Sequence, residues 1–81
     1  MRSILGMDIR KLFGTNLRRY RVRAGLSQEA LAERMGVDRA HVSSMERGQQ
    51  NVTLLTIWSA CEALSARPAD FFDEAVSPVV P

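Results

Sequence analysis

The chain has 81 residues, which suffice for one domain with a modest hydrophobic core. Its apolar share of 46% and charged share of 25% exclude wholesale disorder, and its single cysteine excludes an internal disulfide framework. The net charge of +2 is uneven, because residues 1–47 hold 10 basic and 5 acidic residues (+5) and residues 48–81 hold 1 and 4 (−3), so the basic half favours a polyanionic partner.

The first predicted helix spans residues 8–24 and follows a flexible segment, residues 1–7. The apolar patch of that segment is too short for a signal peptide or a membrane span, so a cytoplasmic location fits best. Apolar residues then recur every three or four positions, which is typical of a helix. Asp8 caps the start, and Gly25 followed by Leu26 ends it. A solvated arginine-rich helix remains the alternative explanation of the basic half.

The second predicted helix, residues 28–35, begins after Ser27, which is a good N-cap. Gly36 ends it, and its inward residues are Ala30, Leu31 and Met35.

The third predicted helix, residues 39–47, follows a link of only three residues. A carboxylate at Asp38 would repel phosphate unless it caps this helix or orients Arg39, and we expect it to cap the helix. Gly48 ends it, and its inward residues are Val42 and Met45. Two short helices joined by so tight a turn must cross steeply.

A fourth helix is predicted after the loop of residues 49–52, with Thr53 as its cap. Its inward stripe is Leu54, Ile57, Trp58, Cys61 and Leu64. Pro68 opens a short fifth helix that contains Phe71 and Phe72. The prolines near the end predict an extended tail over residues 76–81. No segment alternates with a period of two for long enough to form a strand, so an all-α fold is expected.

Short motifs follow one another in unbroken register between residues 17 and 72. They are Leu17-Arg18-Arg19-Tyr20-Arg21, Gly25-Leu26-Ser27-Gln28-Glu29-Ala30-Leu31-Ala32, Gly36-Val37-Asp38-Arg39, Met45-Glu46-Arg47-Gly48, Ala63-Leu64 and Pro68 to Phe72. This ordered set resembles the phage-repressor type of helix-turn-helix, the XRE or Cro/C1 family. The resemblance implies a five-helix DNA-binding domain over residues 8–75, with the helix-turn-helix formed by helices 2 and 3.

A second group of motifs resembles a narrower class within that family. It comprises Asp38-Arg39, Val42-Ser43, Glu46-Arg47-Gly48 and Asn51-Val52-Thr53-Leu54. These motifs are similar to those of the controller proteins of restriction-modification systems, although many general members of the family share much of them.

The base-reading candidates lie on the outward side of the third helix. A helix that enters the major groove N-terminus first presents its first-turn side chains to the base edges. Arg39 can donate to both O6 and N7 of guanine, Ala40 can contact a thymine methyl, and Ser43 or Ser44 can donate or accept. The resemblance implies the same role for Arg39, Ala40 and Ser44. The alternative for Arg39 is a solvated side chain.

The phosphate-binding candidates lie at helix starts and in the loop before the fourth helix. Backbone N–H groups and the helix dipole at an N-terminus favour an anion. Such contacts set the register of the protein on DNA without reading its sequence. The alternative is ordinary polar loop chemistry, and His41 fits a phosphate or solvent better than a base. The candidates are Gln28, His41, Arg47, Gln49, Gln50, Asn51, Thr53 and Arg18.

The resemblance also implies a partly buried ion pair between Arg21 and Glu46, which would join helices 1 and 3. We expect this pair to support the fold and not to take part in chemistry.

An enzyme is not indicated. The single histidine and single cysteine, His41 and Cys61, lie 20 positions apart and belong to no set of nucleophile and base. The sequence has no glycine-rich phosphate loop and no paired metal ligands, so no metal or cofactor is expected. Cys61 is better explained as a small core residue.

The expected assembly is a homodimer on a palindromic or pseudopalindromic operator in double-stranded DNA, because one domain reads only a few base pairs. Leu64, Phe71, Phe72 and the tail are the candidate dimer surface. The rival hypothesis is an antitoxin-type or other protein-interaction module, since Trp58, Phe71 and Phe72 offer more apolar material than a small core needs. The alternative is that all three pack internally. No membrane and no small-molecule ligand are expected.

Overall fold

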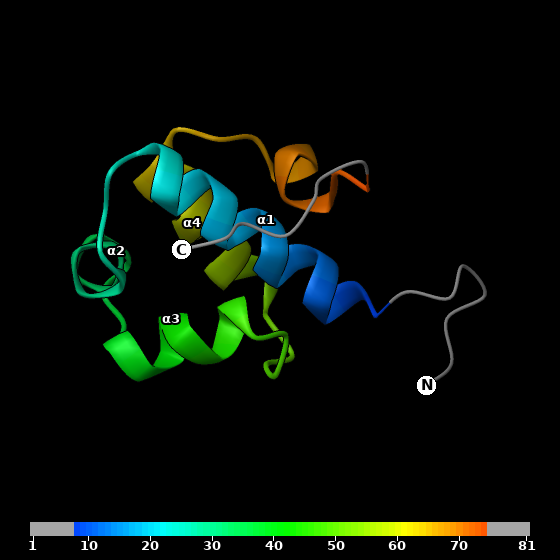
Figure 1. Ribbon diagram of the computed structural model, residues 1–81, viewed down its shortest axis with the longest axis horizontal. Coiled ribbons are helices and arrows are strands. Elements are labelled where there is room, and N and C mark those ends of the chain that lie inside the picture. The colour runs from blue at the N-terminus through cyan, green and yellow to red at the C-terminus, as the bar shows by residue number, and fades with distance from the viewer. Residues whose placement is uncertain (1–7, 75–81) are drawn as a thin grey trace.

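A computed structural model describes residues 8–74 of the chain. It contains four α-helices, α1 (Ile9–Arg23), α2 (Gln28–Met35), α3 (Arg39–Glu46) and α4 (Leu54–Leu64), and a 3₁₀-helix, η1 (Pro68–Phe72) (Figure 1). Residues 8–74 form no strand, so the all-α expectation is confirmed for them. The predicted first segment and extended tail lie outside the described residues.

The predicted fifth helix is the one element whose type differs. Pro68 does open it, but it is a 3₁₀-helix of five residues, after which Asp73 returns to extended backbone. A capping box fixes its start, because the backbone N–H of Arg67 donates to Oδ2 of Asp70 at 2.9 Å. So short a segment favours the tighter 3₁₀ geometry over an α-helix.

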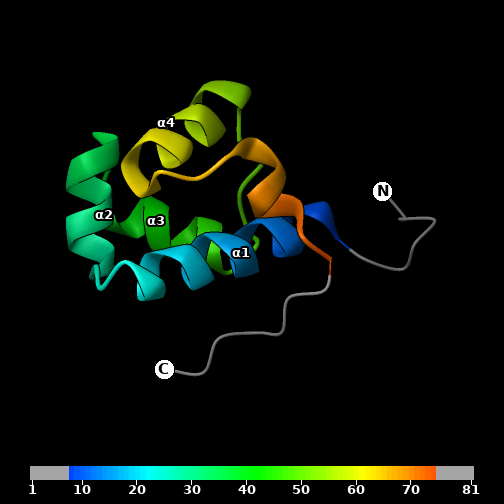
Figure 2. The ribbon, with the colours of Figure 1, turned by 90° about the horizontal axis from the view of Figure 1, so that it is seen from above.

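Helix α1 occupies the centre of the arrangement. It packs against α3 on one side and against η1 on another, while α2 packs against α3 and α4. Figure 1 shows α3 along the lower edge and η1 at the top, and Figure 2 shows α4 on the far side of α1. One surface of α3 is therefore turned away from the rest of the domain.

Side chains cap three of the four helices as the sequence predicts. Asp8, Ser27 and Thr53 each accept a backbone N–H of the helix that they start. Asp38 holds the N-cap position of α3, but its carboxylate makes no capping hydrogen bond, so the expected cap is absent. Because Asp38 is exposed, water can serve its carboxylate instead.

The core gathers apolar side chains from all of these elements. Within α2, Ala32 is buried in place of the predicted Ala30. The ring of Phe71 is fully buried and lies 5.5 Å from that of Phe13 and 5.7 Å from that of Tyr20, measured between centroids. The core residues are Phe13, Leu17, Leu31, Ala32, Met35, Val42, Met45, Ala60, Cys61 and Phe71.

Helix α4 packs three residues of the predicted stripe, Ile57, Cys61 and Leu64, against the core, but turns the other two outward. Leu54, Leu55 and Trp58 are 84%, 80% and 55% exposed, so Leu54 and Trp58 do not face the core as predicted. The inward face is instead made by Ile57, Ala60, Cys61 and Leu64. Two small residues at its centre let the helix approach α2 and α1 closely, which periodicity of large side chains alone does not reveal.

Helices α1 and α3 approach so closely that a side chain would not fit between them. A Cβ atom placed on Gly14 would lie 2.8 Å from the carbonyl oxygen of Glu46 and closer still to that of Met45. At the end of α3, Gly48 adopts a φ of +72°, and a Cβ there would meet Lys11. These two glycines fix the distance between α3 and the helix that supports it.

Candidate nucleic-acid interface

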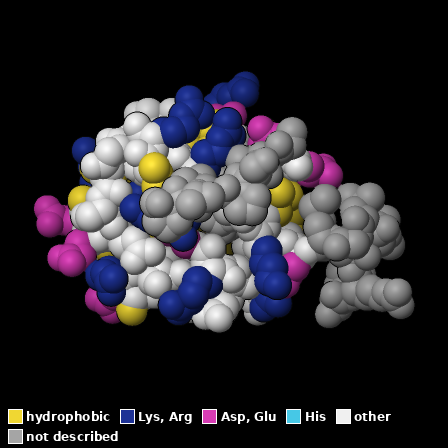
Figure 3. Space-filling view, viewed as in Figure 1, with side chains coloured by type: hydrophobic (Ala, Val, Ile, Leu, Met, Phe, Trp, Pro, Cys, Tyr) yellow, Lys and Arg dark blue, Asp and Glu magenta, His cyan; other side chains and the backbone are white. Residues whose placement is uncertain are grey.

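The buried residues of α3 anchor the helix to the core, and its other residues form an outward face. Val42 and Met45, 0% and 1% exposed, anchor the opposite side of the helix. Arg39, Ala40 and Arg47 are exposed, and Ser43 and Ser44 are half-buried between them. Lys and Arg side chains are spaced along the lower edge of the molecule in Figure 3, the edge at which Figure 1 places α3.

Arg39 lies at the first position of α3 with its guanidinium exposed. Among residues 8–74 it has no hydrogen-bond or ion-pair partner, and Asp38 does not orient it. Every donor of this guanidinium is therefore available to an external acceptor.

Both serines of α3 accept a hydrogen bond from a neighbouring side chain. Nη1 of Arg47 donates to Oγ of Ser43 at 3.2 Å, and Nε2 of Gln50 donates to Oγ of Ser44 at 3.0 Å. Nε of Arg47 also donates to Oε1 of Gln49 at 3.2 Å. The loop after α3 is thus tied to the outward face of that helix.

A buried polar cluster joins α1, α2 and α3. Nε of Arg21 donates to Oε2 of Glu46 at 2.6 Å and Nη2 donates to Oε1 at 3.0 Å, with the two side chains 12% and 3% exposed. Nη1 of Arg21 donates to the carbonyl oxygen of Leu26, and Nε2 of Gln28 donates to Oε1 of Glu46 at 3.1 Å. The expected ion pair is present, and it satisfies charges that burial alone would penalise.

The residues predicted to bind phosphate differ in their exposure and in the hydrogen bonds that they already make. Nε2 of Gln28 donates one of its two protons to Glu46, so the other amide proton and the backbone N–H at the start of α2 are left for a phosphate. Thr53 is occupied in capping α4, whereas Asn51 is exposed. His41 is half-buried on α3. Arg18 lies on α1, with its Nε buried and unpartnered within residues 8–74.

The structure removes one of the three candidate dimer residues. Phe71 is 0% exposed and packs within the core, so it offers no surface to a partner, whereas Leu64 and Phe72 are half-buried. The exposed apolar face lies instead on the first half of α4, at Leu54, Leu55 and Trp58. Leu55 was missed altogether. The signal for this face is that Ile57, Ala60, Cys61 and Leu64 form a complete inward stripe without these residues.

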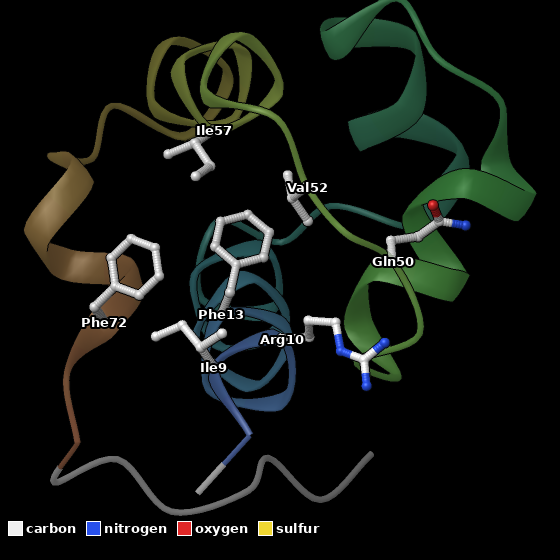
Figure 4. Close-up of a pocket in the computed structure, with 7 residues that line it drawn as sticks. All are labelled: Ile9, Arg10, Phe13, Gln50, Val52, Ile57 and Phe72. Carbon is white, nitrogen blue, oxygen red and sulfur yellow. The ribbon is translucent and has the colours of Figure 1, made fainter. Parts of the chain in front are cut away.

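A small pocket of about 110 Å³ opens at the start of α1 (Figure 4). Its walls are mainly apolar side chains, with Arg10 and Gln50 at its polar side. Nη2 of Arg10 is already paired with Oδ2 of Asp8 at 3.0 Å, and the amide of Gln50 is bonded to Ser44. The residues that line it are Ile9, Arg10, Phe13, Gln50, Val52, Ile57 and Phe72.

The described residues offer little for other chemistry. No group of three or more His, Cys, Asp or Glu side chains within residues 8–74 could hold a metal ion. Burial raises the pKa of the Cys61 thiol, which keeps it protonated and suits a core residue. In the same range, no helix is long and apolar enough to cross a membrane.

Comparisons with known proteins agree with this geometry. The profile of the HTH_3 family, described as helix-turn-helix, matches residues 17–72. The chain is 43% identical over 58 residues to an uncharacterized HTH-type transcriptional regulator, y4dJ, of Sinorhizobium fredii. The matched region spans 72% of this chain and 75% of that protein. It is 44% identical over 63 residues to the control protein C.SmaI of Serratia marcescens, covering 78% and 75% of the two chains.

A solved structure is also similar to the chain, in both fold and sequence. The restriction-modification controller protein C.AhdI from Aeromonas hydrophila superposes with a TM-score of 0.75 at 44% identity, over 78% of this chain and 96% of that one. The similarity covers α2, α3 and the turn between them, from which the outward face of α3 is built.

Proposed function

The chain belongs to the HTH_3 family of helix-turn-helix transcriptional regulators, which are not enzymes, and on that premise we propose that it binds double-stranded DNA sequence-specifically. In this proposal α3 enters the major groove and Arg39, Ala40, Ser43 and Ser44 meet the base edges. The observation that carries the proposal is the exposed guanidinium of Arg39 at the start of α3, which has no partner within residues 8–74.

Phosphate contacts in this proposal come from both sides of α3. The backbone N–H at the start of α2, beside Gln28, is one donor. Arg47 and the exposed loop residues Gln49 and Asn51 are others. Gln50, His41 and Arg18 are weaker candidates because they are half-buried, and Thr53 because its hydroxyl caps α4. Arg47 and Gln49 are exposed and keep free donors beside the hydrogen bond that joins them. These contacts would position the protein on DNA without reading sequence.

The regulatory role that we propose is that of a restriction-modification controller in the cytoplasm. The relatives named control proteins, C.SmaI and C.BamHI, support this role at 44% and 39% identity. The presence of a methyltransferase gene and a nuclease gene beside the gene for this chain would favour it. A neighbouring toxin gene would favour the antitoxin alternative.

The dimer surface that we propose is the exposed half of α4. Leu54, Leu55 and Trp58 present apolar side chains, and the first turn of α4 contains no acidic residue. A two-fold interface brings the same patch of both copies together, so an uncharged apolar patch is complementary to itself. Leu64 and Phe72 are half-buried and packed against the core, so they are weaker candidates for this interface. A second copy is therefore the occupant that we propose for this face.

A protein-interaction module is the alternative that the same face supports. An exposed tryptophan beside two exposed leucines is also the composition of a surface that binds another protein. The two hypotheses predict different assemblies for the purified protein, because a homodimer forms without any other protein. Sedimentation of the pure protein distinguishes them.

The experiment that tests DNA binding is a selection of bound sequences from random duplex DNA, followed by affinity measurements on the selected and a scrambled sequence. Arg39→Ala should weaken binding to the selected sequence by about 1 to 3 kcal/mol and relax the preference at one base pair. Arg67→Ala is the matched control, because it removes the same charge at η1, away from α3.

Two results would count against the proposal. If no sequence is enriched, the protein does not read DNA. If Arg39→Ala weakens binding to the selected and scrambled sequences equally, Arg39 contacts phosphate and not a base.

A further inference from the structure

Lys11 is a basic residue of α1 that belongs to none of the sites described above. It lies directly against Gly48, the residue that ends α3, since a Cβ atom placed on Gly48 would be 2.8 Å from Cα of Lys11 and 2.5 Å from its Cγ. Gly48 is buried, whereas Lys11 is exposed. The stem of the lysine therefore passes over the end of α3, beside the loop that contains Gln49 and Asn51.

The charge of Lys11 is not neutralised by an ion pair. Within residues 8–74 its ammonium group makes no hydrogen bond or salt bridge. The nearest acidic residue in the sequence is Asp8, and Arg10 pairs with it through two contacts, Nη2 to Oδ2 at 3.0 Å and Nε to Oδ1 at 3.2 Å. The charges of Asp8 and Arg10 offset one another, so Lys11 leaves a net positive charge at the start of α1.

The length of α3 places this charge at the rim of the major groove in the proposed docking. In that docking Arg39, the first residue of α3, meets the base edges. The helix rises about 1.5 Å per residue, so Arg47 lies about 12 Å further along its axis. The major groove is only about 8.5 Å deep. A helix that enters N-terminus first therefore has its other end at the rim, where the phosphates lie.

We infer that Lys11 binds a DNA phosphate at the rim of the groove, next to the contacts proposed for Arg47 and Gln49. Figures 1 and 3 show Lys and Arg side chains continuing along the lower edge of the molecule, from α3 toward the start of α1. A lysine binds phosphate as a point charge, so this contact adds affinity and fixes the register of the protein without reading a base. The inference rests on the proposed DNA binding.

A cation beside the end of a helix can also serve the fold alone, because it offsets the negative end of the helix dipole. That role predicts a lower melting temperature for Lys11→Met without DNA, and an unchanged salt dependence of binding. The phosphate contact predicts a changed salt dependence. The two roles are therefore distinguished by measuring both quantities on the same variants.

The first experiment measures how the affinity for a sequence selected from random duplex DNA falls with salt. Each phosphate that a protein neutralises contributes about 0.9 to the slope of log affinity against log salt concentration. Lys11→Met keeps the apolar stem over Gly48 and removes the charge, so the slope should become shallower by about 0.9 for each bound copy. Lys11→Arg keeps the charge and should keep the slope. Arg67→Met is the matched control, because it removes a basic charge at η1, away from α3, and it should leave the slope unchanged.

The second experiment locates the phosphate. A methylphosphonate group replaces one charged phosphate by a neutral group, and a series of duplexes carries it at each position of the selected sequence in turn. At one position it should lower the affinity of the wild-type protein several-fold and change the affinity of Lys11→Met little, because the variant has no charge left to lose there. Arg67→Met should respond to every position as the wild type does.

The outcomes separate the inference from the function on which it rests. If the wild-type protein enriches no sequence, the proposed function fails. If it enriches a sequence but Lys11→Met keeps the wild-type slope, DNA binding stands and the inference fails. A lower melting temperature together with the wild-type slope would assign Lys11 to the helix dipole. A changed base preference in Lys11→Met would also contradict the inference, because a phosphate contact reads no base.

Discussion

The contact between α1 and α3 and the exposed half of α4 are opposite in character. At the first, glycine brings the two helices together without a side chain between them, and Arg21 and Glu46 are 12% and 3% exposed. At the second, Leu54 and Leu55 are at least 80% exposed and touch little of the domain. The first contact keeps the reading helix in place, and the second surface remains open to a partner. Four predictions test this contrast.

The largest expected effect is on the closed contact, at Glu46. Glu46→Ala leaves the buried guanidinium of Arg21 without its ion partner, which costs about 3 to 5 kcal/mol. In a domain of this size, each kcal/mol lowers the melting temperature by about 4 to 8 °C. Glu46→Gln, which keeps the shape, should lose less. A Glu46→Ala variant that melted at the wild-type temperature would refute the structural role of the pair.

The second prediction tests whether the close approach of α1 to α3 matters. In an exposed helix, replacing glycine by alanine stabilises by roughly 0.5 to 1 kcal/mol. At Gly14 the sign should reverse, with a loss of about 1 to 3 kcal/mol, because the new methyl group meets the backbone of α3. Denaturant unfolding measures the difference. Thr15→Ala, at the next position of α1, is the control, and a more stable Gly14→Ala would show that the helices can separate freely.

The third prediction tests the open side of the comparison. Leu55→Lys changes a side chain that is 80% exposed, so the stability of the single chain should change by no more than about 0.5 kcal/mol. Sedimentation should nevertheless show a shift from dimer to monomer. Ala69→Lys, at an exposed position of η1, should leave the dimer intact. A wild-type protein that is monomeric at high micromolar concentration would instead assign this face to another protein.

The smallest effect concerns the capping box at η1, which closes the side of α1 opposite to α3. The backbone N–H of Arg67 lowers the pKa of Asp70 below its ordinary value. The stabilisation is therefore present above the unfolded pKa of about 3.9 and is lost as the pH falls through the folded pKa. Melting curves between pH 7 and pH 2 should show Asp70→Asn less stable than wild type at neutral pH and equal to it in strong acid. A difference that persisted in acid would contradict this role.

The helices themselves could be predicted from sequence because local signals determine them. Ser27, Gly36 and Thr53 each act through their own backbone or the next turn, and all three behave as predicted. The pair of Arg21 and Glu46 followed from the family resemblance, which supplied the long-range information that periodicity lacks.

The remaining features depend on contacts between distant parts of the chain. Phe71 is buried because α1 presents Phe13 and Tyr20 to it, which its position near the chain end did not indicate. Asn16 is fully buried, and its Nδ2 donates to the carbonyl oxygen of Asp73, 57 positions away. The sequence placed Leu54 and Trp58 of α4 inward for the same reason, since the small residues at the centre of this helix become informative only when neighbouring helices are known.

The division of α3 into an anchored side and a free side has a practical consequence. Val42, Met45 and Glu46 hold the helix, whereas Arg39, Ala40 and Ser44 support nothing in the core. A library that randomises only these outward positions would keep its members folded. New binding specificities could then be selected on one unchanged scaffold, with Gln50 varied alongside Ser44 as a single unit.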